Sequence, residues 1–388
     1  MRIGLVCPYS LATPGGVQNH VLGLAGWLLG EGHRVQVLAP DRADPELLRR
    51  HGIPEAVVHS SGRSIPVPYN GSVARITWGP RTALRVRRWV AAGDFDVLHV
   101  HEPITPSAAI LALGAARCPV VATFHTATPR SRTMHLARRL LAGMIERIDA
   151  RIAVSETAAR VVATHLRRDA RIIPNGFSHD QLQASGVARS PHRLAFLGRL
   201  NEPRKGLDVL LQAWPLIRAA HPECELVLAG SGHRELPDGC RALGVLTDAE
   251  RAELLAGAEL FIAPHRGRES FGLVVVEAMA AGAIVVAADI PAFVDVLTGP
   301  DGRPYGHLFR AGNPRALAEA VLAALDEQAV SSANDELRAV ATGAARRYDW
   351  SLVAPQIMGV YAEVAPARVE TPRADESIAS ADWPGWVR

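Results

Sequence analysis

The only lysine of this chain, Lys205, follows Arg199 by six residues in the stretch FLGRLNEPRKG, whereas the other 41 basic residues are arginine. Arginine can hold an anion with two parallel hydrogen bonds, while lysine is a compact charge with rotatable donors, so the two do not substitute freely. Pro203 disfavours a helix between them. We therefore predict that Arg199 and Lys205 bind a diphosphate. A single lysine placed by chance on a surface loop is the alternative.

Two glutamates in RESFGLVVVEAMAAG form a second candidate group. Glu269 and Glu277 would lie about 80° apart around an unbroken helix, so we place Glu269 in the loop that leads into the helix. The amides of Ser270, Phe271 and Gly272 would then open the helix and form an anion site. Glu277 lies in an apolar run and needs polar partners, which are either sugar or ribose hydroxyls or the backbone.

Glycine and histidine positions add to this set. Gly15 and Gly16 separate the first predicted strand from the first predicted helix. Paired glycines let backbone approach a ligand closely, although a plain tight turn explains them as well. Their spacing is not GxGxxG, so a dinucleotide site is not favoured. His125 ends a predicted strand in VVATFHT, although a lone histidine is usually structural.

The elements that must position these residues come in two successive series of apolar runs and helical patterns. The predicted strands are RIGLVCPY, RVQVLAP, FDVLHVHEP and PVVATFHT in the first series, and HRLAFLGRL, CELVLAGSG, LFIAPH and AIVVAAD in the second. This alternation predicts an α/β protein of two Rossmann-like, doubly wound parallel-sheet domains. Ligands bind such sheets at the carboxyl ends of the strands, so the candidate residues face a central cleft.

The domain limits follow from the same pattern. We predict an N-terminal domain over residues 1–175 and a C-terminal domain over 176–345. Residues 346–365 are predicted to form a helix that crosses back to the N-terminal domain. Residues 366–388 hold few large apolar side chains, which predicts a disordered tail.

Composition excludes several classes of protein. The net charge is only +3, so nucleic-acid binding is not expected. The four cysteines are scattered without a CxxC pair, which fits a reducing compartment and disfavours a metal knuckle. Neither a signal peptide nor a run of about 20 apolar residues is visible, so we expect a cytoplasmic protein with at most peripheral membrane contact.

Taken together, GRLNEPRKG, the glutamate pair in ESFGLVVVEAMAAG and the Gly-Gly loop resemble the GT-B retaining glycosyltransferases of family 4, over about residues 1–365. The stretches VCPYS, PVPYNGSVAR, DVLHVHEP, TFHTAT and YDWSLVAPQIM narrow the resemblance to those members that transfer mannose to phosphatidylinositol and so begin phosphatidylinositol mannoside synthesis. PYNGSVAR is the most diagnostic of them.

This resemblance implies a retaining transfer of mannose from GDP-mannose to the inositol 2-hydroxyl of phosphatidylinositol. It implies no resident cofactor, Mg²⁺ at most as a non-essential ion, and a place on the inner face of the cell membrane. Arg199 and Lys205 would hold the diphosphate, and front-face attack would let the departing phosphate oxygen take the acceptor proton.

The resemblance also implies residue roles. The catalytic residues would be His125, Arg199, Lys205 and Glu269, with His125 beside the transferred sugar. The donor site would comprise Gly15, Gly16, Arg199, Lys205, Glu269, Ser270, Phe271, Gly272 and Glu277, with Glu269 on mannose hydroxyls and Glu277 on the ribose. The acceptor pocket would comprise Tyr9, Gln18, Asn70, Arg75 and Thr126.

Two patterns that imitate metal sites are given little weight. Asp94 and Asp96 mimic the DxD of metal-dependent glycosyltransferases, but they precede a strand, so we expect solvated turn residues. His99 and His101 share a strand face without an evident third ligand, so we expect no metal site.

A basic segment follows the acceptor motif in WGPRTALRVRRWVAAG. Pro80 suits a first helical turn, and the arginines that would gather on the helix are Arg81, Arg85, Arg87 and Arg88. A basic helix with Leu84 and Trp89 suits an anionic membrane surface, and a solvated helix face is the alternative.

Other functions stay open on the sequence alone. They are a family 4 transferase with a soluble acceptor such as an inositol phosphate or natural-product precursor, a nucleotide-sugar epimerase, and a non-catalytic lipid-binding module. The acceptor motif counts against the epimerase, and the intact basic and acidic set counts against the binding module. A nicotinamide dehydrogenase is excluded because no GxGxxG follows a strand.

Overall fold

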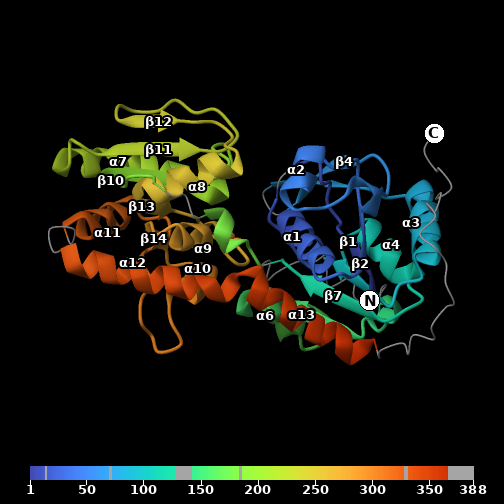
Figure 1. Cartoon of the computed structure of the whole chain (residues 1–388). Coiled ribbons are helices and arrows are strands. Elements are labelled where there is room, and N and C mark those ends of the chain that lie inside the picture. Colours follow the sequence, from blue (N-terminus) through green and yellow to red (C-terminus); the bar gives the residue numbers. More distant parts are fainter. Residues whose placement is uncertain (14, 70–71, 127–141, 183–185, 327–330, 366–388) are drawn as a thin grey trace.

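The computed structural model describes residues 1–13, 15–69, 72–126, 142–182, 186–326 and 331–365. Within them the chain forms two α/β units, each built on a parallel sheet, as predicted. Figure 1 shows the units side by side, one coloured mainly blue to green and the other mainly yellow to orange. The predicted tail, 366–388, and Asn70 lie outside the described residues.

The N-terminal sheet has seven strands in the order β3-β2-β1-β6-β7-β8-β9, and every neighbouring pair is parallel. Its strands are β1 (Arg2–Val6), β2 (Arg34–Ala39), β3 (Val58–Ser60), β6 (Val97–His101), β7 (Val120–Phe124), β8 (Ala150–Ala153) and β9 (Arg171–Ile172). The strand order reverses between β1 and β6, and such switch points are where open α/β sheets bind ligands.

Helices cover both faces of this sheet. Ile3 and Leu5 of β1 belong to the apolar cluster under α1 (Gly16–Gly30), whereas Val6 belongs to the cluster under α3 (Pro80–Gly93) and α4 (Ala108–Ala115). Alternate side chains of one strand therefore feed two cores, as expected of a doubly wound sheet. Among the described residues the unit also contains α2 (Pro45–Arg50) and α6 (Glu156–Leu166).

The C-terminal sheet repeats the arrangement with six parallel strands in the order β12-β11-β10-β13-β14-β15. Its strands are β10 (Ser190–Leu197), β11 (Glu225–Ala229), β12 (Cys240–Ala242), β13 (Ala258–Ala263), β14 (Ile284–Ala288) and β15 (His307–Phe309). The helices are α7 (Leu207–Ala220), α8 (Asp248–Gly257), α9 (Leu273–Ala280), α10 (Pro291–Leu297), α11 (Pro314–Asp326) and α12 (Ser331–Ala345). The switch point here lies between β10 and β13.

One element departs from the parallel pattern. On either side of residues 70–71, which the structure does not describe, β4 (Ile65–Tyr69) and β5 (Ser72–Ile76) pair antiparallel outside the main sheet, and we call this pair of strands the hairpin. Pro66 and Pro68 are tolerated in β4 because each strand of a two-stranded ribbon has a free edge.

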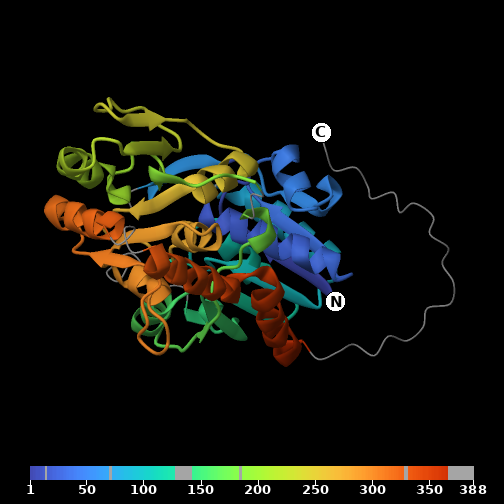
Figure 2. The same cartoon turned by 60° about the vertical axis from the view of Figure 1, so that its left-hand side comes forward.

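The last helix among the described residues, α13 (Trp350–Val364), packs against α1 and β7 of the N-terminal unit. Trp350, Ile357 and Tyr361 are buried in the same core as β1 and α1. Figures 1 and 2 both show the red helices passing from the C-terminal unit to the N-terminal one.

The chain therefore passes twice between the units, and the two passages are bonded to each other. The amide of Phe177 donates to the carbonyl of Tyr348 at 3.0 Å, and the amide of Trp350 donates to the carbonyl of Phe177 at 3.0 Å. The Trp350 ring fills the space beside two glycines, because a Cβ on Gly23 or Gly176 would lie 2.4 or 2.5 Å from it.

Candidate functional site

Lys205 lies at the centre of a charged cluster at the switch point of the C-terminal sheet. Its ammonium is 3.2 Å from a carboxylate oxygen of Glu269 and 3.0 Å from Nε2 of His265. Arg204 reaches the same carboxylate at 3.3 Å. The sequence prediction thus brings Lys205 and Glu269 together, whereas His265 and Arg204 were not foreseen.

Backbone geometry explains how two distant loops meet here. Lys205 ends a short 3-10 turn after β10, and Gly206 follows it with φ +71°. A Cβ on Gly206 would lie 1.8 Å from the carbonyl oxygen of Pro264, which precedes His265 after β13. Only glycine accepts both that conformation and that contact, so it holds the loop of Lys205 against the loop of His265.

The electrostatics of the cluster fix its charges near neutral pH. Burial raises the pKa of Glu269, but the nearby Lys205, His265 and Arg204 outweigh it and bring the pKa down to about 2. Burial and the adjacent Lys205 lower the pKa of His265 to about 3. The cluster therefore presents a carboxylate, a neutral imidazole and two cations, which suits an anionic ligand that also carries hydroxyl groups.

Arg199 joins this cluster through a second carboxylate. Glu202 is buried and contacts Arg199 at 3.4 Å, and it also pairs with Arg204. The side chain of Arg199 is 47% exposed, so it reaches the surface beside the cluster. Arg199 and Lys205 therefore stand at the same strand end, as the sequence predicts, with Glu202 between them.

Glu277 lies in a separate group. It is buried on α9, and its carboxylate accepts from Arg251 of α8 at 3.0 Å, while Arg251 also lies 3.3 Å from Asp248. Burial raises the pKa of Glu277, and Arg251 opposes that shift. Sequence reasoning expected ligand hydroxyls or backbone as partners and missed Arg251, because the two residues are 26 positions apart with no periodic relation.

The loop before α9 behaves as predicted. The helix begins at Leu273, so Glu269 and the segment of Ser270, Phe271 and Gly272 precede it. Gly272 is in the left-handed region with φ +94°, and a Cβ there would meet the ring of Phe293 at 2.8 Å.

Across the N-terminal switch point, Glu102 organises the end of β7. Its carboxylate accepts from the amide of His125 at 2.5 Å and from the amide and hydroxyl of Thr126. Burial raises the pKa of Glu102, and these donors oppose the shift. Glu102 itself has φ +50°, an uncommon conformation outside glycine. The sequence showed Glu102 inside DVLHVHEP, but nothing there indicated this role.

The predicted acceptor residues lie around the end of β1. Asp41 joins that end to the hairpin, because it accepts from the hydroxyl of Ser10 at 2.6 Å and from the amide of Ser64 at 2.7 Å. Arg75 of β5 donates to the hydroxyl of Ser64 at 3.3 Å, and its carbonyl accepts from the amide of Ser10. Tyr9 directly precedes Ser10, and Thr126 stands at the neighbouring end of β7.

Gln18, Gly15 and Gly16 play different parts in the loop before α1 and the start of that helix. The buried amide of Gln18 donates to the carbonyls of Ser10 and Thr13 at 3.3 and 3.2 Å and so holds the loop before α1. A Cβ on Gly15 would lie 2.4 Å from Oε1 of Gln18, whereas one on Gly16 would meet nothing within 4 Å. Gly15 therefore accommodates Gln18, and Gly16 faces open space.

Four buried histidines lie together in the N-terminal unit, whereas only His99 and His101 were expected on one face from the sequence. His99 and His101 do share a face of β6, with ring centroids 4.3 Å apart. Both nitrogens of His99 are engaged, by the hydroxyl of Tyr361 at 2.6 Å and that of Thr123 at 2.7 Å. His101 instead contacts Nε2 of His125 through its Nδ1 at 3.0 Å, and His20 of α1 lies beside both.

The aspartates of GDFDV, Asp94 and Asp96, contact Arg2. Both pair with Arg2 at the amino end of β6, and Asp96 is 2.9 Å from the guanidinium. The expectation of solvated turn residues is right for Asp94, whose side chain is 65% exposed. It is wrong for Asp96, which also accepts from the backbone amide of Arg2 and is largely covered.

Helix α3 carries the predicted basic surface, with one correction. Arg81, Arg85, Arg87 and Arg88 are exposed on it. Trp89 is buried against Phe95, with ring centroids 4.7 Å apart, so it belongs to the core and not to the basic surface. Trp78, just before the helix, is 53% exposed instead.

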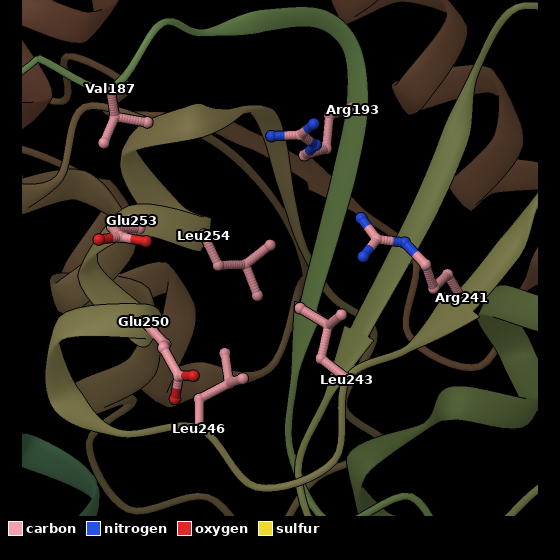
Figure 3. Close-up of a pocket in the computed structure, with 8 residues that line it drawn as sticks. All are labelled: Val187, Arg193, Arg241, Leu243, Leu246, Glu250, Glu253 and Leu254. Atoms are coloured by element: carbon pink, nitrogen blue, oxygen red, sulfur yellow. The ribbon is translucent and has the colours of Figure 1, made fainter.

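A cavity of about 370 Å³ lies apart from these residues. Figure 3 shows its lining from β10, β12 and α8, with Arg193 and Arg241 on one side and Glu250 and Glu253 on the other. It contains none of the predicted site residues. None of the helices among the described residues has the length and apolar character needed to cross a membrane.

Comparison with known sequences matches both halves of the chain. The model of Glycosyltransferase Family 4 matches residues 14–181, and that of Glycosyl transferases group 1 matches 191–327. The phosphatidyl-myo-inositol mannosyltransferase of Propionibacterium freudenreichii is 47% identical over 93% of this chain and 94% of its own length. That of Mycobacterium leprae is 48% identical over 94% of this chain and 97% of its own length.

Solved structures share the fold at low sequence identity. A glycosyltransferase from Rickettsia africae has a TM-score of 0.74 at 16% identity, covering 94% of this chain and 99% of its own. Anabaena HepE, solved in complex with UDP and glucose, has a TM-score of 0.72 at 21% identity, covering 94% of this chain and 100% of its own.

Proposed function

This chain belongs to the GT-B glycosyltransferases of family 4, and from that membership we propose that it transfers mannose from GDP-mannose to the inositol 2-hydroxyl of phosphatidylinositol with retention of configuration. The similarity to the mannosyltransferases of Propionibacterium and Mycobacterium leprae, over nearly their whole length, carries this proposal. A nucleotide sugar is the donor and a phosphatidylinositol headgroup the acceptor, and no nucleic acid takes part.

The donor side of the site follows from the charged cluster. Lys205 and Arg199 hold the diphosphate and stabilise the charge that develops on it as the sugar leaves, and such stabilisation is usually what accelerates a reaction most in an enzyme. Glu269 accepts hydrogen bonds from mannose hydroxyls, since its low pKa keeps it ionised. Glu277 accepts hydrogen bonds from the ribose hydroxyls, while Arg251 balances the charge of the Glu277 carboxylate.

The acceptor side follows from the ends of β1 and β7. Arg75 binds the lipid phosphate, and Tyr9, Gln18, Asn70 and Thr126 surround the inositol ring. Burial lowers the pKa of His125 to about 3, so this residue is a neutral hydrogen-bonding partner for the transferred sugar and not an imidazolium acid.

The proposed reaction needs no resident cofactor. The inositol oxygen attacks the anomeric carbon from the face that the phosphate leaves, and the departing phosphate oxygen takes the hydroxyl proton. Glu269 is the one carboxylate of the charged cluster that faces the proposed sugar position, but its ion pair with Lys205 fits hydroxyl binding better than nucleophilic attack.

The test offers four donor and acceptor combinations to the purified chain. We expect mannosylated lipid from GDP-mannose with phosphatidylinositol vesicles, and no comparable turnover with UDP-glucose or with free inositol phosphate. Faster transfer to the soluble inositol phosphate would establish the alternative function, a family 4 transferase with a soluble acceptor. Exclusive use of UDP-glucose would overturn the proposed donor.

Glu102 gives a prediction about positioning. Glu102→Gln keeps the side-chain shape but turns an amino group toward donors of the loop that carries His125 and Thr126. We expect kcat to fall by about 10- to 100-fold, since one misdirected hydrogen bond to a buried charged group amounts to about 1.5–3 kcal/mol. Steady-state kinetics will separate kcat from KM.

The control for that variant is Glu31→Gln, which alters an exposed glutamate after α1. We expect it to leave kinetics and melting temperature unchanged. A Glu102→Gln enzyme with wild-type kcat, or one that loses activity only in proportion to a lost folded fraction, would contradict the positioning role.

A lipid acceptor lies in a membrane, so the enzyme has to bind the membrane surface. We propose that α3 makes this contact at the inner face of the cell membrane. Figure 1 shows α3 at the outer edge of the N-terminal unit. Beside its arginines, exposed apolar side chains lie on the same stretch of chain: Ile65, Val73, Trp78 and Leu84. Basic and apolar groups together suit the anionic interface of a bilayer.

Neutralising Arg81, Arg85 and Arg88 together to glutamine should weaken binding to vesicles that contain acidic lipid by about 100-fold, at roughly 1 kcal/mol per basic residue. Co-sedimentation measures the change. The matched control neutralises the exposed Arg49, Arg303 and Arg310, which changes the net charge equally. Equal loss in both variants would indicate a bulk charge effect and remove the assignment to α3.

A further inference from the structure

Three histidines from three different elements converge in the core of the N-terminal unit. His20 comes from the middle of α1, His101 from the end of β6 and His125 from the residue after β7. All are buried, and the centroids of their rings are 5.4, 5.1 and 5.3 Å apart pair by pair. One nitrogen of each ring lies within 4.8 Å of those of the other two.

This triangle matches the geometry of a shared metal ion. With a metal–nitrogen distance of about 2.1 Å and tetrahedral angles, three imidazoles have ligand nitrogens about 3.4 Å apart and ring centroids about 5.3 Å apart. The observed centroid distances fall at that value, and Nδ1 of His101 is already 3.0 Å from Nε2 of His125. For all three rings to bind one ion, it is therefore mainly the nitrogen of His20 that has to move closer to the other two.

Several ring nitrogens of this group have no hydrogen-bond partner among the described residues. Among the described residues, neither ring nitrogen of His20 has a hydrogen-bond partner, and Nε2 of His101 has none either. Buried polar atoms are nearly always paired, so an unpaired pair of nitrogens on one buried ring points to a ligand. The ring of His20 also packs against that of Trp350, with centroids 5.1 Å apart, on the side of α13.

The chemical state of the rings suits coordination. Each of the three rings has a nitrogen that can offer a lone pair toward the other two, and imidazole is the commonest metal ligand in proteins. His99 stacks against His101 and is itself held by Tyr361 and Thr123, which fixes the His101 ring from outside. Such outer contacts orient metal ligands in proteins.

We propose that His20, His101 and His125 form a binding site for one divalent transition-metal ion of the zinc and cobalt class. Three neutral imidazoles favour these ions over Mg²⁺, which prefers oxygen ligands. Binding requires the proton that lies between Nδ1 of His101 and Nε2 of His125 to move to the other nitrogen of the ring that carries it, so each ring stays a neutral imidazole and no net proton is released. The fourth coordination position stays open, as in zinc sites with three protein ligands.

The proposal goes beyond the sequence expectation of no metal and beyond the proposed reaction, which uses none. If His125 also contacts the transferred sugar, as the proposed function has it, an ion on His125 competes with that contact. Zn²⁺ then lowers mannosyl transfer. This consequence rests on the proposed function, whereas the binding itself is measured without either substrate.

The test uses the full chain without an affinity tag, freed of metal by a chelator. Titration with Co²⁺ should give one bound ion per chain and the visible absorption of a tetrahedral site. Zn²⁺ should displace the Co²⁺, and a large excess of Mg²⁺ should not. Equilibrium dialysis with elemental analysis gives the stoichiometry.

His20→Gln is the informative variant, because His20 has no part in the proposed reaction. It should abolish the Co²⁺ absorption. The control is His59→Gln on β3, where a solitary histidine also has an unpartnered Nε2. That variant should bind one ion as the wild type does.

X-ray absorption on the zinc-loaded wild-type chain keeps the test decisive if His20→Gln folds poorly. Three imidazole ligands would support the site, and sulfur ligands would assign the ion to cysteines and overturn it. Absence of stoichiometric binding in the wild type would also overturn it. Neither outcome affects the proposed mannosyl transfer.

Discussion

Replacing Lys205 by arginine should lower kcat by about 10²- to 10³-fold, as expected when one group that stabilises transition-state charge is lost. The ammonium fits between Glu269 at 3.2 Å and His265 at 3.0 Å, and the closeness of Gly206 to Pro264 leaves that space fixed. A planar guanidinium is wider, so it either displaces His265 or withdraws from the diphosphate. Mannosyl transfer kinetics with GDP-mannose measure the loss.

Stability must be separated from catalysis in that experiment. Lys205→Arg keeps the charge, and the cluster lies in the loops that follow β10 and β13, so we expect the melting temperature to change little. The control is Arg303→Lys, which makes a matched exchange at an exposed ion pair with Glu336 in the same unit. A wild-type kcat in Lys205→Arg would show that any cation suffices and that the chain's one lysine has no special role.

Replacing Glu277 by alanine should weaken the binding of GDP-mannose by about 10- to 100-fold, the range for a lost hydrogen bond to a charged group. The carboxylate is 8% exposed and holds Arg251 at 3.0 Å, so its loss removes an acceptor for the ribose and releases Arg251. Titration calorimetry gives the dissociation constant directly.

Two further variants locate the cause. Glu277→Gln retains volume and one acceptor oxygen, so its affinity should lie between those of the wild type and the alanine variant. Glu253→Ala removes an exposed carboxylate of the same helix as Arg251, beside the cavity of Figure 3, and should not change affinity. Unaltered affinity in Glu277→Ala would remove this residue from the donor site.

The strand ends were predictable because apolar runs and helical patterns alternate in a way that only parallel α/β units satisfy. That placed Lys205 and Glu269 at one edge, where the structure has them. The Arg251 partner of Glu277 was not predictable, because it depends on how α8 lies against α9. The helical period shows which face of each helix is buried, but not which residue of a second helix meets it.

The histidine triangle shows the same limit. His99 and His101 were visible as a pair because strand residues alternate, but His20 faces them from α1 across the sheet surface. Trp89 shows a different error. It lies on the same buried face of α3 as Thr82 and Val86, so the helical period did contain the information. We assigned Trp89 to the exposed face because arginines surround it in the sequence.

The position of α13 has a consequence for how the chain folds during translation. Trp350, Ile357 and Tyr361 complete the core around β1 and α1, yet they are synthesised nearly 350 residues later. The first half of the chain must therefore wait, with part of its apolar surface exposed, until α13 has been synthesised. Premature termination before residue 350 would leave a product prone to aggregation, however well its own sheet had formed.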